Sequence, residues 1–188
     1  IDALAAAGVR FEHAYIGSWC MTSRASLLTG LQQHGIESMR MEGQYPGSVY
    51  DPEQCRFWPS VFRKNGYTTA HIGKWHTGAD DGFGRDWDYQ IVWNRPKYVD
   101  NSPYYYDNQL IVKNGGKPKM TKGYTTDNYT DWAVDYISGE GREEGKPWYL
   151  WLCYGAVHGP FTPAERHLDD YQDAMVEVPA DIYPPRLD

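Results

Sequence analysis

The residues best suited to chemistry stand in three short stretches that lie far apart in the sequence. The first, CMTSRASLLTG, begins with Cys20 and carries Arg24 where the sequence starts to read as a helix. A helix N-terminus offers free N–H groups and a partial positive charge, so it attracts anions and lowers the pKa of a thiol. The second stretch, GKWHTG, supplies Lys74 and His76, and the third, AVHGPF, supplies His158. Together they predict a nucleophile in an anion-binding site.

Each of these residues also has an ordinary explanation when it is taken singly. A lone cysteine at a helix start is most often a small buried apolar residue. A histidine after an apolar strand is usually structural, and a single lysine is usually solvated. Their joint placement favours a site, but spacing alone fits a thiol enzyme and a phosphatase-like enzyme equally well.

Two predicted strands deliver the basic residues to one place. Residues 67–73 read as a strand that leads into a turn carrying Lys74 and His76, and the apolar run 147–155 leads to His158. The unbroken apolar character of that run is typical of a strand covered on both faces. Because the carboxyl ends of parallel strands share one edge of a sheet, we expect these residues to meet the helix start of the first stretch there.

Helix and strand patterns alternate along the chain, which predicts an α/β fold with a mostly parallel central sheet flanked by helices. The alternating stretch 9–16 reads as a further strand. Residues 77–122 are rich in Gly, Asp, Asn, Pro and Tyr and read as one long irregular segment with a hairpin at 111–117. Apolar periodicity and terminal glycines predict four helices: 2–8, 23–30, 58–66 and 125–138.

The composition is that of an acidic globular chain. Hydrophobic residues make up 41% of the 188 and charged residues 23%, and the net charge of −7 argues against a nucleic-acid-binding face. No apolar stretch approaches the roughly 20 residues of a membrane-spanning helix. The three cysteines, Cys20, Cys55 and Cys153, are odd in number, so no disulfide framework is expected. The 8 Trp and 16 Tyr either fill the core or line a sugar-binding surface.

The ends of the chain fall within structure. The sequence opens inside a predicted helix without an initiator methionine and stops at PPRLD in a loop-like stretch. A chain of 188 residues suits one domain with a sizeable core. We therefore interpret residues 1–188 as part of a single domain that is truncated at both ends.

Three motifs together resemble the sulfatase family of the alkaline-phosphatase superfamily. CMTSRASLLTG resembles the signature in which cysteine, serine and arginine lead into a helix beginning LLTG, and GYTTAHIGKWHTG is similar to the second signature. AVHGPFTPAERHLDDY is similar to a third family stretch, and IDALAAAGVRFEHAY to the segment that precedes the cysteine. The motifs stand in the family's order and span nearly the whole chain, which implies an alkaline-phosphatase-like α/β catalytic domain.

The resemblance implies that Cys20 is no thiol in the active enzyme, because a maturation enzyme oxidises it to Cα-formylglycine. The hydrated aldehyde supplies two hydroxyls on one carbon: one attacks the sulfur of a sulfate ester, and deprotonation of the other then expels sulfate. By the family pattern, Arg24 holds the hydrate, and Lys74 stabilises it and the sulfate oxygens. His76 accepts the proton that drives sulfate release, and His158 protonates the leaving alkoxide.

The resemblance also implies one divalent cation, commonly Ca²⁺, to which Cys20 contributes as formylglycine. The family's other metal ligands and a second active-site lysine are expected outside residues 1–188, so these residues alone are expected to be inactive. Asp80 and Asp81 are adjacent carboxylates, but the family places no ligand there, and we read them as loop residues. Thr22 stands where the family usually has proline or alanine, a difference that concerns the maturation enzyme.

The resulting prediction is a sulfatase that acts on an O-sulfated carbohydrate or a similar alcohol ester. The aromatic insert 83–108 is the expected specificity loop. Two alternatives are a phosphonate or phosphate diester hydrolase of the same superfamily, and a catalytically silent carbohydrate-binding relative in which Cys20 stays a thiol. By resemblance, the protein is expected to be periplasmic or secreted. The remaining histidines are read as structural: His13, His34, His71 and His167.

Overall fold

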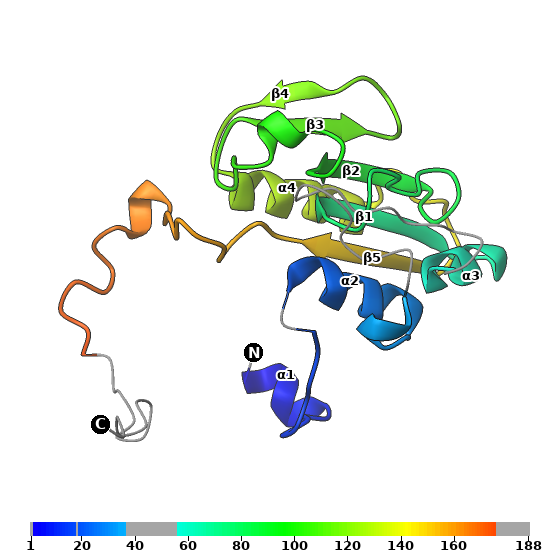
Figure 1. Ribbon diagram of the computed structural model, residues 1–188, viewed down its shortest axis with the longest axis horizontal. Helices are drawn as coiled ribbons and strands as arrows, with labels where there is room; N and C mark the ends of the chain where they lie inside the picture. Colours follow the sequence, from blue (N-terminus) through cyan, green and yellow to red (C-terminus); the bar gives the residue numbers. More distant parts are fainter. Residues whose placement is uncertain (1, 18, 37–55, 176–188) are drawn as a thin grey trace.

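A computed structural model shows an α/β fold built on a five-stranded sheet (Figure 1). It describes residues 2–17, 19–36 and 56–175. The strands lie in the order β4-β3-β2-β1-β5. Their bounds are β1 Thr68–Trp75, β2 Tyr89–Asn94, β3 Gln109–Lys113, β4 Lys119–Thr121 and β5 Trp148–Cys153. The helices are α1 Asp2–Ala7, α2 Cys20–Thr29, α3 Trp58–Lys64 and α4 Thr125–Ser138, with single 3-10 turns at η1 Gln33–Gly35, η3 Val99–Asn101 and η4 Glu165–His167.

The sheet is mixed, and its parallel pairs flank β1. This strand runs parallel to β2, with Ala70 opposite Tyr89, and parallel to β5, with Thr68 opposite Trp148. The β2–β3 and β3–β4 pairs are antiparallel. The carboxyl ends of β2, β1 and β5 therefore meet at one edge of the sheet, which is the arrangement that the sequence predicted for β1 and β5.

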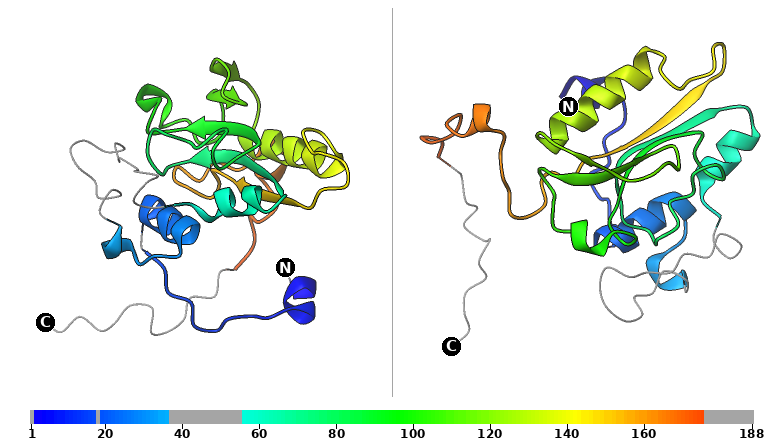
Figure 2. Two further views of the ribbon diagram at one scale, coloured as in Figure 1. Left: turned by 90° about the vertical axis from the view of Figure 1, so that its right-hand side faces the viewer. Right: turned by 90° about the horizontal axis from the view of Figure 1, so that it is seen from above.

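Helices cover both faces of the sheet (Figure 2). Helix α2 lies on one face together with α3, and helix α4 lies on the other. Alternate residues of each strand point to opposite faces, so two separate cores form. The core under α2 contains Met21, Ala25, Leu28, Phe57, Trp75, Trp87 and Val92. The core under α4 contains Ala70, Ile72, Tyr89, Ile91, Trp93, Tyr129, Ala133 and Tyr136.

The four predicted helices and the predicted hairpin are confirmed. Gly30 caps the end of helix α2, and its φ of 72° is a left-handed conformation that costs little only for glycine. The β3–β4 hairpin begins its turn with Asn114 and Gly115, both of which have positive φ. That pair is a common hairpin signal, because tight turns between twisted strands need positive φ.

The prediction of one irregular segment over 77–122 is wrong, because β2 runs through it. All six residues of β2 are buried. A strand buried on both faces shows no alternation of polar and apolar residues, so the run YQIVWN carries no periodic signal. The expected specificity loop 83–108 thus contains a core strand.

Two further expectations about strands need correction. Residues 9–16 form no strand, and the side chains of Val9, Phe11 and Tyr15 are exposed. A strand needs a hydrogen-bonding neighbour, and among the described residues the sheet offers none to this stretch. Strand β5 forms as predicted, but most of it is only half-buried, because within the described chain it lies at the edge of the sheet.

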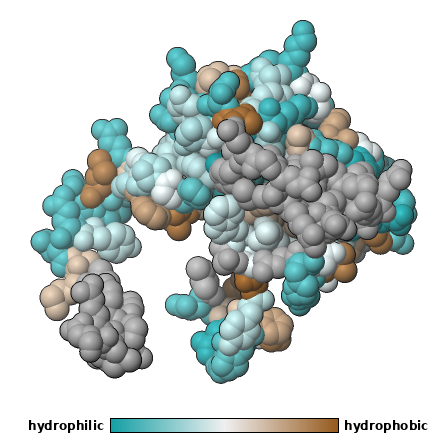
Figure 3. Space-filling model, viewed as in Figure 1, coloured by the Kyte–Doolittle hydropathy of each residue, from teal (hydrophilic) through white to brown (hydrophobic). Residues whose placement is uncertain are grey.

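One face of the molecule is mostly polar. On the face shown in Figure 3, hydrophilic side chains dominate and hydrophobic ones form small separate patches. Among the residues that the structure describes, no helix is both long and apolar enough to cross a membrane. Cys20 and Cys153 are free thiols. Cys55 and the terminal PPRLD lie outside the described residues.

His71 belongs to the core, in line with its structural interpretation. Its ring lies 5.4 Å from each of the rings of Trp75, Trp87 and Trp151. Complete burial, followed by the charge of Arg24, lowers the pKa of His71 to about 3. The folded chain therefore holds this histidine neutral.

We expect the free energy of unfolding to fall as the pH drops below about 6.5, the ordinary histidine pKa. Between that value and about 3, His71 takes up a proton in the unfolded chain but not in the folded one, so acid favours unfolding. Denaturant titrations at about pH 7 and about pH 4 measure this loss, which should be smaller in His71→Phe. His13 is exposed, so His13→Phe serves as the control. Between the two pH values, its free energy of unfolding should fall by as much as that of the wild type. An unchanged pH dependence in His71→Phe would contradict the prediction.

Candidate active site

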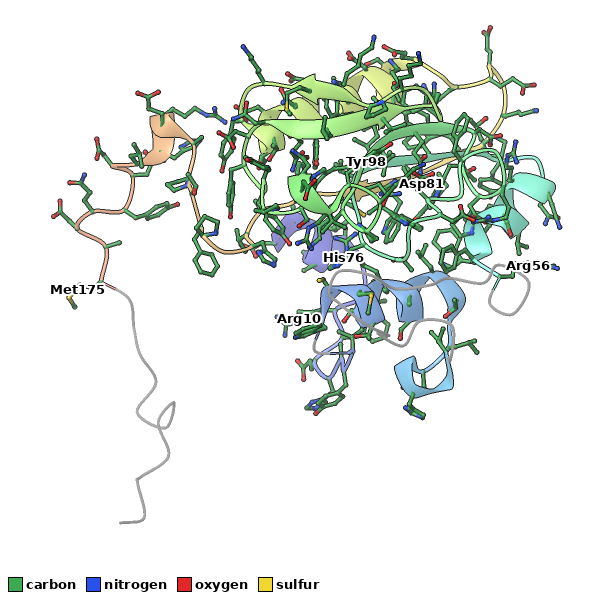
Figure 4. All side chains as sticks on the ribbon, turned by 45° about the horizontal axis from the view of Figure 1, so that its top comes forward. Arg10, Arg56, His76, Asp81, Tyr98 and Met175 are labelled. Carbon is green, nitrogen blue, oxygen red and sulfur yellow. The ribbon has the colours of Figure 1, made fainter. Side chains whose placement is uncertain are left out.

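The predicted residues of the first two motifs converge at the carboxyl edge of the sheet. Cys20 is the first residue of α2, Lys74 lies inside β1 rather than in a turn after it, and His76 follows that strand directly. The Sγ atom of Cys20 lies 3.0 Å from Nδ1 of His76. Figure 4 shows His76 between the sheet and α2. The thiol of Cys20 and the imidazole of His76 are thus in direct contact.

Gly73 allows the strands of the site to pack closely. Its φ is +108°, and a Cβ there would lie 2.2 Å from the carbonyl oxygen of Cys153 and 2.8 Å from the ring of Tyr129. A side chain would collide with both β5 and α4, so only glycine fits. The close approach holds the end of β1 against the strand that leads to His158.

Arg24 joins the start of α2 to the end of β1. It lies one turn after Cys20, and its Nη1 donates a hydrogen bond to the carbonyl oxygen of Lys74 at 3.0 Å. Its guanidinium carbon also lies 5.7 Å from the centre of the Trp151 ring. These contacts fix the helix start relative to the strand end and place a permanent positive charge between them.

Burial and positive charge dominate the electrostatics of the site. Lys74 is 3% exposed, and burial lowers its pKa to about 8. His76 is fully buried, and burial together with the charges of Arg95, Lys74 and Arg24 lowers its pKa to about 2. Several cations thus surround position 20 on a chain whose net charge is −7. An anionic ligand would offset their mutual repulsion.

Arg95 is a functional candidate that sequence reasoning missed. It is buried directly after β2, and its Nη1 lies 3.2 Å from Nδ1 and 3.4 Å from Nε2 of His76. Its Nε donates to the carbonyl oxygen of Ser102 at 3.0 Å. A basic residue at the end of a buried strand was the signal that singled out Lys74. The same signal would have found Arg95 had β2 been recognised.

His158 reaches the site on the segment that follows β5. Its Nδ1 lies 2.9 Å from the carbonyl oxygen of Gly159. A carbonyl can only accept, so Nδ1 carries a proton and Nε2 is left for proton exchange. The hydroxyl of Tyr106 donates to the carbonyl oxygen of His158. The ring of His158 stacks on that of Tyr105, whose hydroxyl lies 3.4 Å from Nζ of Lys74. The third motif thus joins the other two through Tyr105.

Comparison with known proteins identifies the family, because residues 1–178 match the family described as Sulfatase. This chain belongs to the sulfatase family. It is 31% identical over 185 residues to an N-acetylglucosamine-6-O-sulfatase of Bacteroides thetaiotaomicron, an alignment that covers 97% of this chain and 30% of the relative. It is 28% identical over 193 residues to the uncharacterized sulfatase YidJ of Escherichia coli, covering 95% of this chain and 37% of that one.

Solved structures of sulfatases share the fold. The structure of BT4656 in complex with its substrate D-glucosamine-2-N,6-O-disulfate matches with a TM-score of 0.78 and 26% identity, covering 95% of this chain and 33% of that one. The sulfatase chain described here therefore spans about a third of the length of these relatives. The α/β fold predicted from the motifs is confirmed.

The carboxylates near the site do not make up a metal centre in this part of the sulfatase. Asp80 forms an ion pair with Arg85 at 2.6 Å, and Asp81 accepts a hydrogen bond from Asn94 at 3.0 Å. Both contacts agree with their interpretation as loop residues. Across residues 2–17, 19–36 and 56–175, no group of three or more His, Cys, Asp or Glu side chains is placed to hold a metal ion. These residues therefore do not fit a complete Ca²⁺ site.

The other residues singled out in the sequence lie in ordinary surroundings. The hydroxyl of Thr22 donates to the carbonyl oxygen of Trp19 at 3.1 Å, a contact within the first turn of α2. His13 and His34 are exposed. His167 lies 2.7 Å from Asp170 at the surface. The structure brings none of these four into the cluster around Cys20.

Proposed function

We propose that the complete protein is a sulfatase that hydrolyses a sulfate ester of a sugar through a formylglycine formed from Cys20. We also propose that residues 1–188 are part of its single catalytic domain. The observation that carries the proposal is the 3.0 Å contact between Cys20 and His76 within a cluster of buried cations. Sulfate transfer needs a nucleophile, a proton acceptor beside it and positive charge around the sulfuryl group, and this edge of the sheet supplies the positions for all three.

Each residue of the cluster then has a distinct task. Formylglycine at position 20 would supply an aldehyde hydrate as the oxygen nucleophile. Arg24 holds the hydrate and offsets its charge, and Lys74 stabilises both the hydrate and the charge that builds up on the sulfate oxygens. His76, whose Nδ1 faces position 20, accepts the proton of the second hydroxyl of the hydrate, so that the aldehyde forms again and sulfate leaves. His158 uses Nε2 to protonate the alkoxide that leaves as its bond to sulfur breaks.

The proposed alcohol is the 6-hydroxyl of a glucosamine-type sugar. The Bacteroides relative is named an N-acetylglucosamine-6-O-sulfatase, and the substrate in the BT4656 structure is a 6-O-sulfated glucosamine. The last part of the aromatic insert supports a sugar ligand. Its residues Pro103–Asp107, of which Tyr105 and Tyr106 are largely buried, line a cavity of about 420 Å³ together with Tyr124 and Pro160. The hydroxyl of Tyr106 donates to the carbonyl oxygen of His158. Tyrosine rings offer flat area with a polar edge, which suits a sugar ring.

Two measurements on the complete protein test this function. After co-expression with a formylglycine-generating enzyme, mass spectrometry of the peptide containing Cys20 should show conversion of the thiol to the aldehyde. Turnover of 6-sulfated N-acetylglucosamine and of an aryl sulfate should exceed turnover of an aryl phosphodiester. An unmodified thiol without cleavage would support the silent carbohydrate-binding relative. A clear preference for the phosphodiester would support the phosphonate or phosphodiester hydrolase instead.

Thr22→Ala is a matched control for the maturation step. This change restores the family's usual residue, and alanine is a good helix former in the first turn of α2. Equal conversion of Cys20 in the wild type and the variant shows that threonine is accepted at this position. If Cys20 is converted only in the variant, a lack of activity in the wild type is due to failed maturation and not to a defect in the active site.

A further inference from the structure

Tyr105 contacts several residues of the proposed site, although no sequence motif includes it. Its ring stacks on His158 with centroids 3.8 Å apart and planes 9° apart. Its hydroxyl lies 3.4 Å from Nζ of Lys74, which itself lies 5.0 Å from the ring centre. The guanidinium carbon of Arg95 lies 4.7 Å from the same centre. One aromatic ring therefore touches the proton donor and two of the cations.

The position of Tyr105 is fixed by its own surroundings. It is 4% exposed, and the ring of Trp93 packs against it edge-on at 5.0 Å. Its carbonyl oxygen accepts a hydrogen bond from the hydroxyl of Thr125, the first residue of α4, at 2.7 Å. A Cβ on Gly155 would lie 2.9 Å from that same oxygen, so the chain after β5 runs directly past it. Tyr105 thus contacts β2, α4 and the segment that follows β5.

We propose that Tyr105 is a positioning residue that holds His158 in line with the sulfate-binding cations. The proposal rests on the proposed sulfatase function. His158 is itself exposed, on a segment beyond the end of the sheet, so its ring needs a packing surface to keep one orientation. The buried face of Tyr105 provides that surface. Stacking of a flat ring on a flat ring restricts both rotation and tilt of the imidazole, which aims Nε2 at one place.

The ring and the hydroxyl of Tyr105 have separable effects. Tyr105→Phe keeps the stacking surface and removes the contact between the hydroxyl and Lys74. Tyr105→Leu removes both. If the ring positions the acid, only the loss of the ring should change how strongly the rate depends on the leaving group. The hydroxyl should affect sulfate binding, because it contacts Lys74.

The test compares an activated aryl sulfate with 6-sulfated N-acetylglucosamine, using the complete protein. For Tyr105→Leu we expect kcat on the sugar sulfate to fall by about 10- to 100-fold and kcat on the aryl sulfate by less than about threefold. For Tyr105→Phe the ratio of the two rates should stay unchanged, while inhibition by inorganic sulfate weakens. Tyr67→Leu is the matched control. The ring of Tyr67 is also stacked, with its centroid 4.8 Å from that of Phe62, but it lies just before the amino end of β1, away from the proposed site. This change should leave both rates unchanged.

Equal losses of Tyr105→Leu on both substrates, or no loss on either, would overturn the proposal. If Tyr105→Leu fails to fold, Tyr105→Met, which also lacks a ring, takes its place. Equal losses on both substrates, or no loss on either, would count against positioning in this variant too. A second readout needs no activity. In protein with labelled histidines, the Hε1 resonance of His158 should show a ring-current shift in the wild type and Tyr105→Phe. An unshifted resonance refutes the stack, whereas absent sulfate-ester turnover with a shifted resonance refutes only the sulfatase function.

Discussion

Cys20→Ala is expected to abolish sulfate-ester hydrolysis by the complete protein, with a loss in kcat/KM of about 10⁴-fold or more. Position 20 opens α2 and lies 3.0 Å from His76, so its replacement by alanine removes the group that attacks sulfur. The cations that remain can still bind the ester, so KM should change far less than kcat. Initial rates on an aryl sulfate and on 6-sulfated N-acetylglucosamine measure both constants. A residual rate within tenfold of the wild type would contradict the proposed role.

Cys20→Ser separates attack from release. A serine offers one hydroxyl, so after attack on sulfur the enzyme carries a sulfate ester and has no second hydroxyl through which to expel it. We expect one equivalent of alcohol per enzyme and then no further turnover. Mass spectrometry of the peptide should show one added sulfuryl group. Cys153→Ala, which removes the other described thiol, is the control and should retain most of the activity.

His158→Ala is expected to have the second largest effect, and the effect should depend on the substrate. A sugar alkoxide is a poor leaving group that needs a proton as its bond to sulfur breaks, so its turnover should fall by about 10²- to 10⁴-fold. An activated aryl sulfate leaves as a stable phenolate and should be much less affected. The control is His167→Ala, an exposed histidine on the same segment. Equal losses on both substrates would remove His158 from the acid role.

The sequence predicted the parts of the site that belong to compact motifs. Cys20, Arg24, Lys74 and His76 stand beside recognisable helix starts and strand ends, and parallel pairing of β1 and β5 places the end of each strand on one edge. The direction of two strands and the position of one helix are enough to bring these four residues together. Such information is local, because apolar runs and terminal glycines mark the elements directly.

Arg95 and Tyr105 could not be predicted in the same way. Their roles depend on β2, a buried strand within a stretch rich in turn residues, and on the loop that follows it. Tyr105 gains its importance from a ring stacked on a histidine 53 residues later, and no spacing rule predicts such a pair. The prediction of a strand at residues 9–16 fails for a related reason. Alternation of polar and apolar residues indicates which side chains share a face of a strand, but it does not indicate whether a neighbouring strand is present to pair with it.

The parallel pairing of β1 with β5 has a consequence for how the protein is made. Thr68 and its partner Trp148 are about 80 residues apart, so at typical synthesis rates β1 leaves the ribosome on the order of ten seconds before its neighbour exists. During that interval one edge of a buried eight-residue strand lacks its native partner and can pair with another nascent chain. The newly made chain is therefore open to pairing through this strand edge during an interval in which it also lacks His158, and a chaperone that shields residues 68–75 would raise the yield of active protein.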